Sequence, residues 1–266
     1  MFGKYFCQSL TLLTALSLSL SAQSQEVAQD FGDAKVYELL GSPEFSNAEL
    51  QLATPLNEAT LKEGENTFDF TVKNFQLGAQ TPDAGKNMCA NSSKGQHIHF
   101  IMDNAPYVAS YSPKIVSDMK PGHHVLLAFL SRSYHESIKT KKAHLIREFN
   151  VGPDAKDDFN EKAPHIFFSR PKGEYVGENE NRKIMLDFYL INCNLSPKGY
   201  KVRATVDDKE FMLTKWAPYI IEGLKFGGHK VKLELLDKDN KLVKSPFNGV
   251  ERSFNLTIDM TPPKKN

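Results

Sequence analysis

The stretch KGQHIHFIMDN, residues 94–104, places two histidines one residue apart in an alternating pattern. Successive side chains of a β-strand point to opposite faces, so His97 and His99 share one face while Ile98 and Phe100 share the other. Neutral imidazoles are good ligands for Zn and Cu ions. The spacing therefore indicates either two metal ligands on one strand face or a strand whose outer face is simply polar.

The strands that would position these histidines occur twice in the chain. Residues 94–104 align with KGYKVRATVDD at 198–208, and PGHHVLLAFLSR at 121–132 aligns with FGGHKVKLELLD at 226–237. Further blocks upstream and downstream recur in the same order. This order of matching blocks predicts an internal duplication.

Each copy consists of alternating runs such as TFDFTV and KVKLEL, separated by turns rich in glycine, proline and asparagine. Strands of this size and spacing are typical of a β-sandwich of about seven strands and about 100 residues. We therefore predict an all-β protein of two tandem immunoglobulin-like β-sandwich domains. The expected boundaries are unit one at 47–152, a linker at 153–159 and unit two at 160–262.

The first 24 residues have the pattern of a secretory signal peptide, with a short basic start, an apolar core and small residues at its end. Residues 25–46 form a leader to which the sequence assigns no element. No later stretch is apolar enough to span a bilayer. We therefore expect a periplasmic or secreted protein.

Composition and motifs exclude several classes of function. The chain has 266 residues and a formal net charge of +1, and its scattered lysines and arginines give no reason to expect a nucleic acid partner. It has no glycine-rich phosphate loop, no Gly-x-Ser-x-Gly turn and no HExxH motif. These features favour a non-enzymatic binding or adaptor protein of unknown ligand, with a protein or peptide as partner class. They do not indicate the oligomeric state.

Comparison of the two copies makes three histidines metal candidates. His97 and His99 align with Lys201 and Arg203, two cations that we expect to face water, so both imidazoles should point out of the sandwich core. His135, in the following loop, has no counterpart in unit two, and we expect it to approach the other two histidines. Zn or Cu is the expected ion. Surface histidines bonded to carbonyls or water are the alternative.

Unit one also has an apolar outer strand face, formed by Val125, Leu127 and Phe129. Apolar outer faces of this kind are usually covered. The insertion loop, unit two or a partner protein are the candidates for the cover. The aligned positions of unit two are instead charged: Lys230, Lys232 and Glu234.

Two cysteines lie beyond the predicted signal peptide, and an oxidising compartment permits a disulfide between Cys89 and Cys193. Cys89 lies in an insertion at 78–95 that unit two lacks. A bond would tie this loop to unit two. Two separate thiols are the alternative.

Unit one resembles an uncharacterised family of bacterial periplasmic β-sandwich domains, on the stretches LQLATPLNEATLKEG, HIHFIMD and PGHH. That family carries a Gly-His-His-His-Leu-Leu-Ile-Asp signature and a later Pro-Gly-Lys-His strand with a downstream histidine. His97, His99, His124 and His135 fall on its histidine positions, and Ile98 replaces the middle histidine of the signature. The resemblance implies no established activity, but it adds His124 to the metal candidates.

His124 consequently has two interpretations. It aligns with His229 just after a glycine turn, and a residue present at such a turn in both copies is more typical of a structural role. The resemblance instead implies that it is a ligand.

The whole chain is also similar to exported proteins of the Bacteroidetes type that carry an automatic phosphopeptide-binding label. The stretch SRSYHES, residues 131–137, resembles the Ser-Arg-x-His of forkhead-associated domains, although here the spacing is Ser-Arg-x-x-His. The resemblance implies that Ser131 and Arg132 bind phosphate. The chain has no Gly-Arg loop upstream to match that family's other phosphate contacts.

Overall fold

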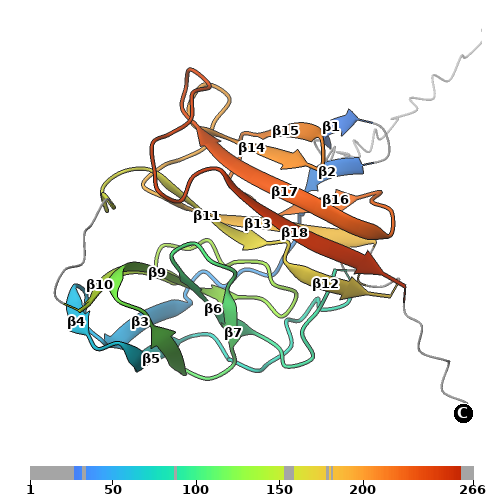
Figure 1. Ribbon diagram of the computed structural model, residues 1–266. Helices are drawn as coiled ribbons and strands as arrows, with labels where there is room; N and C mark the ends of the chain where they lie inside the picture. Colours follow the sequence, from blue (N-terminus) through green and yellow to red (C-terminus); the bar gives the residue numbers. More distant parts are fainter. Residues whose placement is uncertain are drawn as a thin grey trace, which may run out of the picture.

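The computed structural model describes residues 27–31, 34–86, 89–152, 159–177, 180 and 182–258. The predicted signal peptide and most of the predicted linker lie outside these residues. The described part of the chain forms eighteen β-strands in four sheets (Figure 1). Within these residues, no helix is long and apolar enough to cross a membrane.

Unit one is a β-sandwich built from β3 to β10. One sheet has the strand order β3-β5-β8 and the other β4-β10-β9-β6-β7, in which β4 runs parallel to β10. Alternating apolar residues of both sheets meet between them, where Phe68 packs edge to face on Phe100 and Phe149 at centroid distances of 5.0 and 5.5 Å. The strands are β3 (Glu49–Thr54), β4 (Ala59–Leu61), β5 (Gly64–Lys73), β6 (His97–Met102), β7 (Val108–Ser110), β8 (Lys114–Met119), β9 (Gly122–Ser131) and β10 (His144–Val151).

Unit two repeats this arrangement strand for strand. Its sheets contain β11-β13-β16 and β12-β18-β17-β14-β15, and β12 again runs parallel to β18. The register shift in the pairing of β3 with β5, between Leu52 and Thr54, recurs in the pairing of β11 with β13, between Phe168 and Arg170. The prediction of two immunoglobulin-like sandwiches from a duplication is confirmed. The strands are β11 (His165–Arg170), β12 (Gly173–Val176), β13 (Lys183–Ile191), β14 (Lys201–Val206), β15 (Lys209–Leu213), β16 (Tyr219–Glu222), β17 (Gly227–Leu236) and β18 (Val250–Thr257).

The leader adds two strands to unit two, β1 (Val27–Phe31) and β2 (Ala34–Glu38). β2 pairs antiparallel with β16, and the side chain of Val36 is fully buried in the core of unit two. Five alternating residues are too few for the sequence pattern to identify such a strand. The first part of the chain therefore completes the second sandwich.

The two sandwiches pack face to face. The outer face of β6 and β9 contributes Ile101, Leu127 and Phe129, which are fully buried against Phe167 and Tyr189 of β11 and β13. Figure 1 shows β6 and β9 on one side of this contact and β11 and β13 on the other. The apolar outer face predicted for unit one is therefore covered by unit two, and we call this contact the interdomain core.

Candidate metal centre

Three histidines converge at one edge of the interdomain core. His97 Nε2 lies 2.9 Å from His99 Nε2 and 3.1 Å from His135 Nδ1. One ligand nitrogen from each residue lies within 4.8 Å of the other two. We call His97, His99 and His135 the histidine cluster. The expectation that His135 approaches the two strand histidines on one face is confirmed.

The hairpin geometry of unit one explains this convergence. On β9, Ser131 is paired with His97 and Phe129 with His99. After Ser131 the chain turns and returns to it through an isolated bridge with Ser137. His135 lies in this turn with φ of +68°, a left-handed conformation that is uncommon outside glycine. The turn therefore folds the His135 ring back over the start of β6.

Unit two contains a counterpart of His135 that the sequence alignment did not identify. Asn240 has φ of +60° and lies in the turn closed by the Leu236–Leu242 bridge, which corresponds to the Ser131–Ser137 bridge. Lys201, the counterpart of His97, donates a hydrogen bond of 3.0 Å from Nζ to Asn240 Oδ1. The scaffold therefore brings these two positions together in both units, and the residue types decide the chemistry.

The histidines are less exposed than the sequence predicted. His97 and His99 have no exposed surface, although Lys201 and Arg203 at the same places in unit two are only half-buried. Unit two covers His99, whose Nδ1 lies 3.2 Å from Ser169 Oγ at the end of β11. The Tyr107 ring stacks on the His99 ring with centroids 3.6 Å apart and planes at 8°. The imidazoles do leave the core of unit one, but they enter the interdomain core rather than water.

The hydrogen bonds of His97 fix its tautomer. Its Nδ1 lies 2.8 Å from the carbonyl oxygen of Gly95, which can only accept, so Nδ1 carries the proton and Nε2 presents a lone pair. Both His99 Nε2 and His135 Nδ1 lie within 3.1 Å of His97 Nε2, which has only this one lone pair. Only one of them can donate a well-formed hydrogen bond to it. A cation at the centre would accept lone pairs from all three nitrogens.

Burial keeps the cluster uncharged. It lowers the pKa of His97 to about 4, an effect partly opposed by the bond to Gly95. Burial also lowers the pKa of His99 and His135 well below the ordinary value, and the neighbouring histidines and Arg170 add to this. All three imidazoles are therefore neutral at pH 7, as metal ligands must be.

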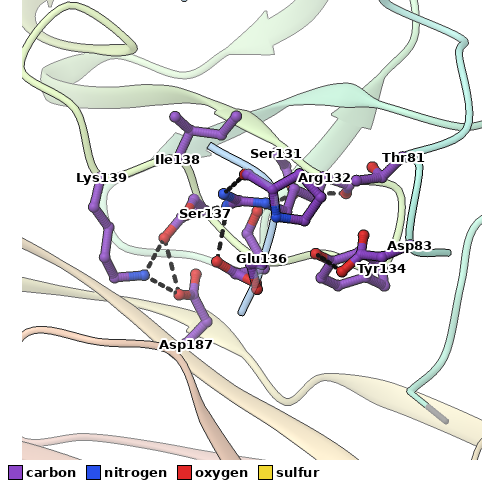
Figure 2. Close-up of polar contacts among 12 residues, drawn as sticks. Thr81, Asp83, Ser131, Arg132, Tyr134, Glu136, Ser137, Ile138, Lys139 and Asp187 are labelled. Atoms are coloured by element: carbon purple, nitrogen blue, oxygen red, sulfur yellow. Dashed lines mark hydrogen bonds and ion pairs between the residues drawn. The ribbon is translucent and has the colours of Figure 1, made fainter. Parts of the chain in front are cut away.

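The loop that carries His135 is anchored to unit two. The carboxylate of Asp187, on β13, accepts hydrogen bonds from Ser137 Oγ at 2.9 Å and from Lys139 Nζ at 2.5 Å (Figure 2). Asp187 has no exposed surface. Ser169 and Asp187, two residues of unit two that no sequence motif identified, therefore help to position the histidines of unit one.

The structure does not support a phosphate site at Ser131 and Arg132. Ser131 is fully buried, and Arg132 Nη1 forms an ion pair of 2.8 Å with Glu136 (Figure 2). Arg132 also donates to the carbonyl oxygen of Pro43 and lies over the Phe45 ring. This arginine is neutralised inside the protein, so the phosphopeptide hypothesis is wrong for these two residues.

His124 does not belong to the histidine cluster. Its Nδ1 lies 2.6 Å from Asp103 Oδ2 and its Nε2 lies 2.8 Å from the Lys120 carbonyl oxygen. His229 makes the same two contacts in unit two, with Asp207 and Lys225. Phe129, the partner of His99, lies five positions after His124 on β9, a distance of roughly 17 Å along the strand. The structural interpretation of His124 is confirmed, and its assignment as a ligand is wrong.

No disulfide joins Cys89 and Cys193. Cys89 forms an isolated bridge with Lys183 at the start of β13, whereas Cys193 follows the end of the same strand. The nine-residue strand β13 separates the two places by roughly 30 Å, which a disulfide cannot span. Burial raises the pKa of both thiols to about 12. The insertion loop does meet unit two, but through this backbone bridge and not through the disulfide that the sequence permitted.

The chain matches no family model and no curated protein. Solved structures with a similar arrangement include the fibronectin(III)-like modules of Clostridium thermocellum CbhA, at 11% identity and a TM-score of 0.29, covering 82% of this chain and 98% of that one. The tandem Ig repeats of Dlar match at 7% identity and a TM-score of 0.25, covering 79% and 98%. A Bacteroides ovatus glucan-utilisation protein, SGBP-B, matches at 9% identity and a TM-score of 0.24, covering 79% and 71%.

Proposed function

We propose that this protein is an exported, non-enzymatic binding protein that holds one transition-metal ion of the Zn and Cu class at the histidine cluster. The observation that carries the proposal is the position of two neutral imidazoles, those of His99 and His135, next to the single lone pair of His97 Nε2. Among these three nitrogens, at least one close contact joins two atoms that lack a proper hydrogen bond. An ion removes this conflict.

The distances suit such an ion after small shifts. With bonds of about 2.0–2.1 Å, two nitrogens of a tetrahedral site lie about 3.4 Å apart. Two of the three separations are 2.9 and 3.1 Å, so these pairs need to move apart by a few tenths of an ångström, whereas the third pair, which lies within 4.8 Å, has to move closer. Metal-bound histidines usually donate their second ring N–H to a carbonyl or similar acceptor, which orients the ring. Gly95 and Ser169 supply these acceptors for His97 and His99.

The position of the site suggests a structural use of the ion. All three ligands belong to unit one, while Ser169 and Asp187 support them from unit two. Binding of an ion would therefore favour the docked arrangement of the two sandwiches. A rigid two-domain protein of this kind suits a binding or adaptor role.

The test is elemental analysis of protein purified without a histidine tag and equilibrated with Zn or Cu salts. We expect about one ion per chain for the natural sequence and none for the His97→Asn/His99→Asn double variant. Asparagine can still donate from the position of Nδ1, so the contacts to Gly95 and Ser169 are conserved while both Nε2 atoms are lost. His229→Asn is the matched control, because it removes a histidine of unit two from outside the cluster.

Folding of each variant is checked by circular dichroism. A folded natural protein that holds no ion would refute the proposal. So would equal binding by the double variant and the control.

A further inference from the structure

A group of buried cations without carboxylate partners lies beside the histidine cluster. Arg170 and Arg252 are 7% and 8% exposed. Arg170 Nη1 donates to the Tyr175 hydroxyl at 2.9 Å, and its guanidinium lies 5.3 Å from the centre of the Tyr107 ring. Arg252 donates to backbone carbonyls, including that of Asn104 at 2.9 Å. Within the described part of the chain, neither guanidinium has an anionic partner.

A third cation, Lys172, is coupled to the cluster through an aromatic stack. Its Nζ lies 4.0 Å from the centre of the Tyr107 ring, and that ring stacks on His99 at 3.6 Å. The ammonium group is therefore within about 8 Å of the His99 ring. Burial, Arg170 and Arg252 lower the pKa of Lys172 to about 8, so it remains mostly charged at pH 7. Burial is the largest cause of this shift, and the two arginines add repulsion to it.

We propose that the histidine cluster selects monovalent copper, Cu(I), over divalent ions, an inference that rests on the proposed function. Three neutral imidazoles bring no negative charge, and the buried Arg170 and Arg252 together with the half-buried Lys172 repel any metal ion that approaches. Repulsion grows with the charge of the ion, so a divalent ion is disfavoured about twice as strongly on a logarithmic scale.

Coordination chemistry points the same way. Zn(II) with three protein ligands takes a water or another ligand in a fourth position. Cu(I) has a closed d-shell and is satisfied by two or three neutral nitrogen ligands. The histidine cluster offers three nitrogens in a site where His97 and His99 have no exposed surface and His135 is only partly exposed. A low-charge ion that needs no further ligand fits these surroundings.

The test compares Cu(I) and Zn(II) affinities by competition with chromophoric chelators, under anaerobic conditions for Cu(I). We expect the natural protein to bind one Cu(I) and to bind it more tightly than Zn(II). The substitution Lys172→Met removes the positive charge and keeps an apolar side chain of similar length. It should strengthen Zn(II) binding roughly 100-fold and Cu(I) binding roughly tenfold. Lys172→Gln gives a second neutral variant in case methionine perturbs the fold. Lys230→Met, which removes an exposed charge of unit two, should change neither affinity.

The outcomes separate this inference from the proposed function. Tighter binding of Zn(II) than of Cu(I), or equal gains for both ions in Lys172→Met, would overturn selection of Cu(I) while leaving a metal site. Zn(II) binding that requires added phosphate or chloride would also overturn it, because an anion would then balance the cations. If neither ion binds the folded natural protein, the proposed function itself fails.

Discussion

The substitution Leu127→Ala tests whether the two sandwiches share one core. Leu127 has no exposed surface and lies in the interdomain core with Phe167 and Tyr189. Truncating a leucine that is buried in this way costs about 3–5 kcal/mol of unfolding free energy, through lost transfer energy and the cavity left behind. If the sandwiches did not dock, the same side chain would face solvent and the cost would be about 0.5 kcal/mol or less. The predicted loss of unfolding free energy is thus several-fold larger for docked sandwiches than for undocked ones.

Leu126→Ala is the matched control, because Leu126 is the adjacent residue, equally buried, but faces the core of unit one. The assay uses Trp216, the single tryptophan of the chain, which packs on Tyr189 of unit two with ring centroids 4.9 Å apart. Urea unfolding followed by its fluorescence therefore reports on unit two. With a slope of about 3 kcal/mol per molar urea, Leu127→Ala should lower the Trp216 midpoint by about 1 M or more.

Docking also predicts that the control lowers the Trp216 midpoint, because a shared core makes the units unfold together. Independent sandwiches would leave the fluorescence midpoint of unit two unchanged in both variants. An unchanged midpoint in Leu127→Ala would refute the interdomain core, and with it the burial of the histidine cluster.

Three further predictions follow from the site and its neighbours. Alkylation in denaturant should label both Cys89 and Cys193 with or without prior reduction, and intact-mass measurement would reveal a disulfide if one exists. The metal-free protein should lose stability as pH falls from 6.5 toward 4, because histidines of the unfolded chain bind protons in this range and the buried histidines do not. His97 alone accounts for about 3 kcal/mol of unfolding free energy. Urea midpoints measured across this pH range would show the loss, and His97→Asn should remove the part that belongs to His97. Asp187→Ala leaves Lys139 without its carboxylate partner and frees the His135 loop, so it should cost about 3–5 kcal/mol in urea unfolding and weaken metal affinity at least about tenfold in chelator competition.

Strand alternation was sufficient to predict most of the fold. The inward positions of β6, such as Ile98 and Phe100, are buried in the core of unit one as expected. The duplication showed which strands correspond, and the structure reproduces the correspondence down to the parallel pair at each sheet edge. The leader escaped prediction because β2 is short and its partner, β16, lies more than 180 residues away. A local pattern contains no information on such a pairing.

The site was predictable in its members but not in its surroundings. His97, His99 and His135 could be identified because they differ from the second copy at strand and loop positions. Their burial could not be identified, because it depends on Ser169 and Asp187, whose contacts cross the interdomain core. The resemblance to a histidine-rich signature added His124, whereas the comparison between the copies correctly marked it as structural.

The comparison between copies failed where the two copies have different neighbours. Lys201 and Arg203 occupy an outer sheet face of unit two against which no further sandwich packs within the described residues, so long cations are tolerated there. The same face of unit one lies against β11 and β13, where a long cation without a partner would be costly. Imidazoles fit this buried face because they can be neutral, and the turn that joins Lys201 to Asn240 in unit two joins His97 to His135 in unit one. The strand-to-turn contact is common to both sandwiches, but only in unit one is it buried by the other sandwich. The candidate metal centre results from this combination.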